Sequence, residues 1–185
     1  MNRHSYKRDW LPTYTGEKIK TLRPDPEKIH IIDIAHHLSL LSRFCGATSK
    51  LCSVAQHSVI VSDMLKYKGC ESSTILWGLL HDAAEAYLGD IRMEVKQLLP
   101  GFRKLEDHWL KIIITKYNLT WPEPEVVKEM DWIVGNNEAL SLYPHGSLEF
   151  FNIQDVRRIY LTPWTSEHAE KVFLDRFTTA SFRML

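Results

Sequence analysis

One long apolar run constrains the fold of this chain more than any other segment. Residues 75–90 read ILWGLLHDAAEAYLGD, a helix-like stretch with His81 and Asp82 at its middle. A buried carboxylate is costly unless it is paired with a cation or bound to a metal. Adjacent histidine and aspartate side chains on a helix can both reach one cation, although a helix-surface hydrogen bond is the simpler alternative. The segment therefore predicts a mostly buried helix with an ion-binding or ion-pairing site.

The rest of the chain predicts an all-α helical bundle. Apolar residues recur at helical spacing over most of residues 31–185, which we expect to form a helical core. Residues 1–30 differ, because the stretch around Thr15-Gly16 and the two following prolines favours a short β-hairpin or loop. Both segments are expected to form one domain. Helices are predicted near Asp33, from a capping box at Ser53 and Gln56, over 71–88 with Gly89 as the C-cap, after Pro124, and from Ser166.

Composition excludes several classes of protein. The 23 basic and 23 acidic residues balance, so no global basic field predicts binding to nucleic acid or to a membrane surface. No apolar run is as long as a membrane span, and no signal peptide is evident at the N-terminus. Cys45, Cys52 and Cys70 are an odd set without C-x-x-C spacing. They predict reduced thiols and a cytoplasmic location.

Two further residues extend the His81-Asp82 pair into a candidate metal site. His57 lies upstream in SVAQHSVIVSDML, and Asp131 lies downstream in VKEMDWIVGNNEAL. Two imidazoles and two carboxylates suit one divalent Mn, Fe, Co, Ni or Mg ion, with Zn also possible. Four protein ligands in six-coordinate geometry leave two positions for water and a substrate oxygen, as hydrolysis requires. The chain has no Gly-rich phosphate loop and no G-x-S-x-G motif, so catalysis would depend on the metal.

Glu85 and Asp90 are the candidate catalytic residues. Helical spacing places Glu85 on the same face as His81 and Asp82, and Asp90 follows Gly89, where the helix should end. A carboxylate near a metal-bound hydroxide can orient it or carry a proton to the leaving oxygen. Glu85 as a solvated helix residue and Asp90 as the N-cap of a helix starting at Ile91 are the alternatives.

Three segments carry a family resemblance. SVAQHS, LLHDAAEAYLGDI and VKEMDW are similar to the HD-domain phosphohydrolases, and specifically to the small bacterial and phage branch near the 5'-deoxynucleotidases. The resemblance covers about 31–139, and TYTGEKI and PWTSEHAEKVFLDRF are also similar. It implies that the metal ligands are His57, His81, Asp82 and Asp131. It also implies that Glu85 and Asp90 act on the water and the leaving group.

The resemblance implies a substrate-binding pair as well. An arginine followed by an aromatic residue lies upstream of the first metal histidine in these relatives, at the phosphate and the sugar or base. Arg43 and Phe44 occupy that place. Many of these deoxynucleotidases have tryptophan there, so phenylalanine leaves the preferred sugar and base open. The alternative is a core position for Phe44 and a helix C-terminal cation at Arg43.

The expected function is hydrolysis of a small-molecule nucleotide. Release of phosphate from deoxynucleoside 5'-monophosphates is favoured, because the chain is short and no basic cluster is visible for two further phosphates. A deoxynucleoside triphosphate triphosphohydrolase of the dATP type has the same ligand set and stays an alternative. A non-catalytic nucleotide-binding module with the same fold is a third hypothesis. The resemblance also implies a homo-oligomer.

Overall fold

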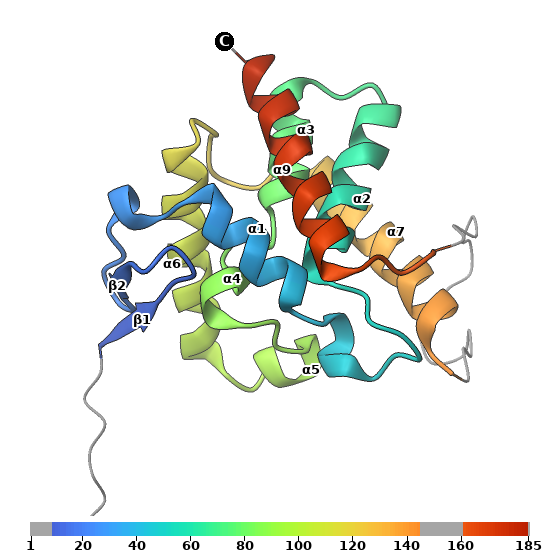
Figure 1. Cartoon of the computed structure of the whole chain (residues 1–185), viewed down its shortest axis with the longest axis horizontal. Coiled ribbons are helices and arrows are strands. Elements are labelled where there is room, and N and C mark those ends of the chain that lie inside the picture. The colour runs from blue at the N-terminus through green and yellow to red at the C-terminus, as the bar shows by residue number, and fades with distance from the viewer. Residues whose placement is uncertain (1–8, 145–160, 185) are drawn as a thin grey trace, which may run out of the picture.

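The computed structural model describes residues 9–144 and 161–184, and this part of the chain is mostly helical with one small hairpin (Figure 1). The prediction of an all-α fold with a short N-terminal hairpin is therefore confirmed. None of the helices in the described ranges is both long and apolar enough to cross a membrane. The helices are α1 (Ile31–Leu40), α2 (Val54–Tyr67), α3 (Ser72–Leu80), α4 (Glu85–Leu88), α5 (Met93–Lys96), α6 (Pro100–Lys116), α7 (Glu125–Leu142) and α9 (Ser166–Phe182), with short 3₁₀ turns η1 (Pro26–Lys28) and η2 (Arg43–Gly46).

The N-terminal hairpin is attached to the first helix. Strands β1 (Trp10–Pro12) and β2 (Lys18–Lys20) pair antiparallel, with Leu11 opposite a buried Ile19. The turn between them passes through Gly16, whose φ of 89° suits glycine. At the tip, the backbone N–H and the hydroxyl of Thr15 donate to the two carboxylate oxygens of Asp33 at 2.7 and 2.9 Å. Asp33 is fully buried in α1, so these bonds satisfy its charge and fix the hairpin.

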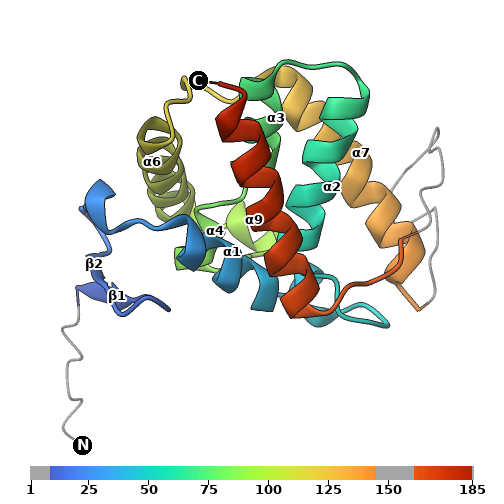
Figure 2. The same cartoon turned by 45° about the horizontal axis from the view of Figure 1, so that its top comes forward.

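Helix α2 is the central element of the bundle. It packs against α1, α3, α7 and α9, and Figures 1 and 2 show it between α9 and α7. Half of the expected capping box forms at its N-terminus, where the hydroxyl of Ser53 accepts the backbone N–H of Gln56 at 3.2 Å. The Gln56 side chain instead donates to the Thr162 carbonyl at 2.9 Å and accepts the Trp164 N–H at 3.0 Å. These bonds attach α2 to the segment that leads into α9.

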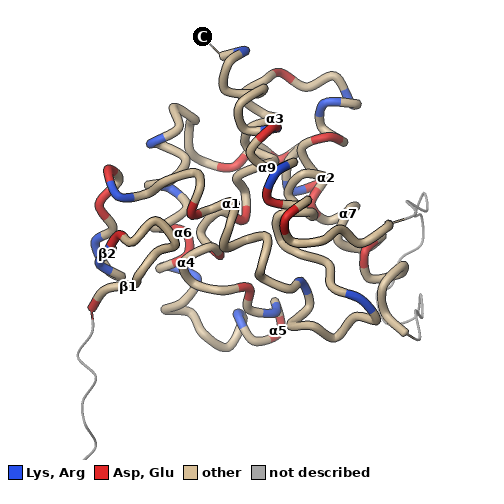
Figure 3. Tube along the Cα trace, in the orientation of Figure 1, with Lys and Arg blue, Asp and Glu red and all other residues tan. Residues whose placement is uncertain are grey.

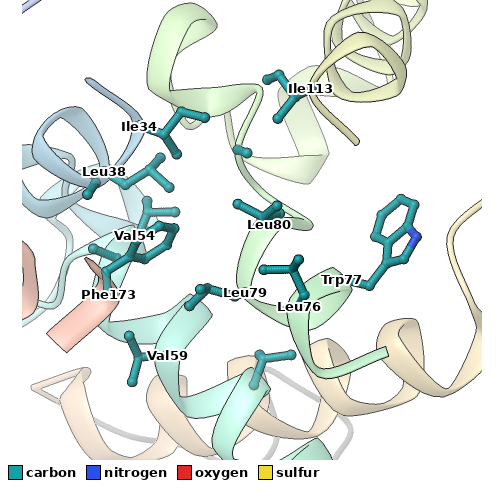
Figure 4. Close-up of a cluster of buried hydrophobic side chains, with 14 of the residues drawn as sticks. Ile34, Leu38, Val54, Val59, Leu76, Trp77, Leu79, Leu80, Ile113 and Phe173 are labelled. Atoms are coloured by element: carbon teal, nitrogen blue, oxygen red, sulfur yellow. The ribbon is translucent and has the colours of Figure 1, made fainter. Parts of the chain in front are cut away.

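The apolar residues of α3 form the middle of the core. Leu79 and Leu80 lie among side chains of α1, α2 and α9, including Phe173 (Figure 4). Gly78 allows α3 to approach α2 closely, because a Cβ atom there would overlap the side chain of Leu65. Together with the bond from the Ser62 hydroxyl to a carbonyl of α3, this contact fixes the end of α3 beside α2. The close packing determines which residues meet at the site described below.

The predicted single helix over 71–88 is wrong, because the chain turns at 81–84 between α3 and α4. The backbone N–H groups of Ala83 and Glu85 donate to the carbonyls of Leu80 and Asp82, three residues back, at 2.9 Å each. This tighter pattern replaces the four-residue spacing of an α-helix. Gly89 ends α4 as predicted, with φ at 85°.

Candidate metal centre

The four residues expected to bind metal converge from three parts of the fold. His57 lies in α2, His81 and Asp82 in the turn after α3, and Asp131 in α7. The two histidine Nε2 atoms are 3.3 Å apart, and Asp131 Oδ1 lies 2.9 Å from the first and 3.7 Å from the second. Asp82 Oδ2 lies 3.3 Å from His81 Nε2 and 3.8 Å from His57 Nε2. One ligand atom each from His57, His81 and Asp131 falls within 4.8 Å of the others, a spacing that allows a shared ion.

The opposite ring nitrogens show that this donor set fits a cation. His57 Nδ1 lies 3.0 Å from Glu138 Oε1, and His81 Nδ1 lies 2.8 Å from the Gly78 carbonyl. Both partners accept, so each neutral ring carries its proton on Nδ1 and directs a lone pair from Nε2 toward the other ring. Two lone pairs and two carboxylates at such distances repel unless a proton or a cation lies among them. A divalent cation among His57, His81 and Asp131 would remove this repulsion.

The histidines and carboxylates of the cluster shift one another's pKa values. Burial alone would raise the pKa of Asp131 and Asp82, but hydrogen bonds and charge from the histidines lower both below the ordinary range. Burial would likewise lower the pKa of His57 and His81, yet the surrounding carboxylates raise both. Protons therefore bind tightly here in the metal-free protein. A metal ion must displace them, so metal affinity depends on pH.

Glu138 supports the cluster from behind. It lies seven residues after Asp131 in α7, and its side chain is fully buried. Oε1 accepts from His57 Nδ1, while Oε2 accepts from Arg43 Nε at 3.1 Å. Burial would raise the pKa of Glu138, but the charges of His57 and Arg43 outweigh it and lower the pKa. Glu138 is thus an ionised carboxylate that holds both a candidate metal ligand and the candidate substrate arginine.

A pocket of about 280 Å³ opens beside the cluster. Its walls include Asp82 and Asp131 from the cluster itself. They also include the four other residues singled out from the sequence, which are Arg43, Phe44, Glu85 and Asp90. The structure therefore places all the candidate residues at one locality, with the two histidines behind the pocket wall. A ligand in this pocket would contact the exposed side of the candidate metal site.

Arg43 is oriented by the site and does not cap a helix. Helix α1 ends at Leu40, and the Arg43 side chain turns toward Glu138 and toward Asp82, whose Oδ2 lies 3.6 Å from Nη1. Gly135 in α7 makes room for it, because a Cβ atom there would lie 3.3 Å from Nη2. The alternative of a helix C-terminal cation is therefore wrong.

Phe44 is a wall residue of the pocket, so the alternative of a core position is also wrong. The side chain is half-buried, and its ring meets that of Tyr143 edge-on with centroids 5.4 Å apart. Phe44 and Cys45 both have left-handed backbones, with φ of 57° and 51°. Such strain persists only where surrounding contacts impose it and is common at functional sites. The turn presents an apolar ring beside the Arg43 guanidinium, 5.2 Å from the ring centre.

Glu85 and Asp90 both retain protons more readily than ordinary carboxylates. Burial is the main cause that raises the pKa of Glu85 well above its ordinary value, and the charges of Asp82 and Asp90 add to it. Burial also raises the pKa of Asp90. The alternative of Asp90 as the N-cap of a helix starting at Ile91 is wrong, because α5 begins at Met93 with Arg92 at its N-cap position. Glu85 is buried and therefore not a solvated helix residue either.

Sequence reasoning missed several residues of the site. From the sequence alone, Lys96 would be interpreted as a solvated lysine or as a phosphate contact. In the structure it lies in the pocket wall between Glu85 and Glu106. Tyr143 and Gly135 carry no motif signal, and their roles depend on the approach of α7 to η2. Glu138 alone had a usable signal, because it shares a helix face with Asp131 at a seven-residue spacing.

Comparison with known proteins shows the family of this chain. No family model matches the sequence. The chain is 31% identical to the uncharacterized protein YfdR of Escherichia coli (strain K12) over 175 residues, which cover 93% of this chain and 96% of YfdR. It is 33% identical to an uncharacterized protein of Rhodobacter capsulatus over 127 residues, which cover 66% of this chain and 65% of that protein. The chain therefore belongs to the YfdR family.

Proposed function

We propose that this protein is a metal-dependent phosphohydrolase of the HD-domain type that releases phosphate from deoxynucleoside 5'-monophosphates. One observation carries the proposal: two imidazole Nε2 atoms face two aspartates that line a pocket, with the histidines directly behind the pocket wall. That pocket also presents an arginine and two carboxyl groups of raised pKa. A divalent cation bound there would supply a Lewis acid for the phosphoryl group and an acidified water.

The chain's own residues account for binding of the phosphate. Arg43 has five N–H donors, of which Glu138 accepts the one on Nε. The remaining donors of the guanidinium form a planar fork that matches two phosphate oxygens. The two contacts with carboxylates hold this fork at the pocket wall. Arg43 would therefore orient the phosphate without a large loss of side-chain entropy on binding.

Glu85 and Asp90 would move protons. A carboxyl group whose pKa is raised toward neutrality can donate a proton to a leaving oxygen and can take one from water. Both groups line the pocket, and their shifts arise from burial and from nearby negative charge. In this proposal the pair protonates the 5'-oxygen of the leaving nucleoside and orients the attacking water.

The charges of the pocket favour the monophosphate over a triphosphate. Among the described residues, five carboxylates and three cationic side chains line the pocket. Lys96 already pairs with Glu85 in this group, and Arg43 already pairs with Glu138 behind the pocket wall. Charged residues of both signs are interspersed over the described elements, as Figure 3 shows. A triphosphate would bring additional negative charge into a wall that offers little positive charge to balance it.

A substrate panel tests this proposal. The protein is stripped of metal, reconstituted with Mn²⁺, Co²⁺ or Mg²⁺, and incubated with deoxynucleoside and ribonucleoside mono- and triphosphates while phosphate and triphosphate are measured. We expect phosphate from deoxynucleoside monophosphates, none with Asp82→Ala, and full activity with Glu129→Gln. Glu129 is a matched control, because it lies in α7 near Asp131 but is exposed and paired with Lys68.

The other outcomes decide between the alternatives. Release of triphosphate from deoxynucleoside triphosphates would replace the proposal with a triphosphohydrolase. Binding of metal and nucleotide without any product would indicate a non-catalytic module.

A further inference from the structure

Lys96 lies in the wall of the pocket, yet its ammonium group is already paired with two carboxylates. Its Nζ atom donates to Glu85 Oε1 at 3.0 Å and to Glu106 Oε1 at 2.8 Å. The side chain is only 14% exposed, and those of its partners are 5% and 17% exposed. Lys96 belongs to α5, Glu85 to α4 and Glu106 to α6, so one ammonium group joins three helices. Such contacts are not those of a solvated surface lysine.

The charge balance of the triad of Lys96, Glu85 and Glu106 disfavours a direct contact between Lys96 and a phosphate. One ammonium faces two carboxylates, so the triad has no excess positive charge when all three groups are ionised. Burial alone would lower the pKa of Lys96, but the two carboxylates outweigh it and raise the pKa. The ammonium therefore stays charged and stays paired. A phosphate that approached Lys96 would compete with two carboxylates that are already in place.

The triad has a direct effect on the orientation of Glu85. Oε1 of Glu85 is held by Lys96, whereas Oε2 is buried and has no hydrogen-bond partner among the described residues. An orphaned buried oxygen in a native protein indicates a catalytic role or a missing partner. Because Lys96 is itself fixed by Glu106 in α6, the carboxyl group of Glu85 cannot rotate freely. Its second oxygen is left for the reaction.

We propose that Lys96 is a positioning residue that, anchored by Glu106, holds Oε1 of Glu85 and leaves Oε2 to exchange a proton with the substrate. This inference rests on the proposed function. It assigns Lys96 and Glu106 no contact with the phosphate. Positioning of an acid-base group contributes to turnover, whereas a phosphate ligand contributes to substrate binding. The two roles therefore separate in steady-state kinetics.

The kinetic test compares Lys96→Met, Lys96→Arg and Glu106→Gln in the metal-loaded protein with a deoxynucleoside monophosphate. For Lys96→Met we expect kcat to fall by roughly tenfold to a hundredfold, with KM and Mn²⁺ affinity nearly unchanged. Lys96→Arg should recover part of the lost kcat. The kcat of Glu106→Gln should lie between those of the unaltered protein and of Lys96→Met. Lys128→Met is the matched control, because Lys128 also pairs with a glutamate at 3.0 Å but is exposed. A large rise in KM with kcat unchanged would overturn the proposal in favour of phosphate binding.

A second test does not depend on activity. In the metal-free protein, Lys96→Met should lower the melting temperature by roughly 6 °C or more, because it leaves the buried carboxylate of Glu85 and the half-buried carboxylate of Glu106 without their cation. Adding Glu85→Gln to Lys96→Met should recover part of that loss. Strictly additive effects would show that Lys96 does not hold Glu85 and would overturn the proposal. If the unaltered protein hydrolyses no phosphate ester, the proposed function and the role of Lys96 in catalysis both fail. The melting temperatures of the single and double variants would still decide whether Lys96 holds Glu85.

Discussion

Replacement of Glu138 by glutamine tests the connection between the candidate metal ligands and the substrate arginine. The fully buried carboxylate accepts from His57 Nδ1 at 3.0 Å and from Arg43 Nε at 3.1 Å. Glutamine has the same shape and can still accept one of these bonds through its carbonyl oxygen. It removes the negative charge, and its amide group can only donate. One of the two N–H donors therefore loses its acceptor.

The expected loss of stability in Glu138→Gln follows from the burial of the carboxylate. Breaking a buried ion pair by removing one partner costs about 3–5 kcal/mol. Asp82, 3.6 Å from Arg43, still balances part of the guanidinium charge. We therefore expect the lower end, about 3 kcal/mol, which corresponds to a fall in melting temperature of roughly 6–12 °C for a chain of this length. Loss of the group that orients a metal-binding histidine typically lowers metal affinity by about 10–100-fold.

Two measurements check these values. Urea unfolding of the metal-free protein gives the free energy of unfolding, and calorimetric titration with Mn²⁺ gives the metal affinity. Glu129→Gln, on the exposed side of the same helix, should change neither. The double variant Arg43→Met/Glu138→Gln should be more stable than Glu138→Gln alone, because it removes the unpaired buried charge. Unchanged stability and metal affinity in Glu138→Gln would refute the reasoning.

Three other predictions concern catalysis, substrate and pH. Glu85→Ala and Asp90→Ala should leave Mn²⁺ bound but lower turnover by about a hundredfold or more, and loss of metal in either variant would assign that residue to the metal site instead. Deoxynucleotides should be preferred over ribonucleotides by about a few kcal/mol at most, because the ring of Phe44 only modestly rejects an added hydroxyl, and equal rates with AMP and dAMP would contradict this. The raised pKa values of His57 and His81 stabilise the metal-free fold below pH about 6.5, and this contribution is lost as the pH rises through the raised values. Since the metal displaces those protons, the gain in melting temperature with Mn²⁺ should grow from pH 6 to pH 8, and a gain independent of pH would argue against the two histidines as ligands.

Local patterns in the sequence predicted much of the helical architecture. Ser53 caps the N-terminus of α2, the helix after Pro124 forms as α7, and α9 begins at Ser166. The break between α3 and α4 was not predictable from periodicity, because the apolar pattern continues through it. The turn depends instead on contacts that only the tertiary structure supplies. One of these is the close approach of α3 to α2 at Gly78.

The candidate site was foreseeable in its residue types but not in its arrangement. Histidine and aspartate chemistry, with the family resemblance, identified the four residues that the fold brings together. Apart from Glu138, whose spacing from Asp131 is a usable signal, the supporting groups arise from tertiary packing, which spacing along the chain does not encode. Glu106 reaches the site only through α6 and Lys96, and Tyr143 meets Phe44 only because α7 ends beside η2.

Anomalous diffraction from crystals soaked in Mn²⁺ tests the central claim most directly. We predict one strong peak at the cluster, with bonds of roughly 2.0–2.3 Å to His57 Nε2, His81 Nε2 and one oxygen each of Asp82 and Asp131. In the Asp82→Ala variant, that peak should be absent. A fully soaked crystal without a peak between the two histidines would contradict the account, as would an ion there with Asp131 outside coordination distance.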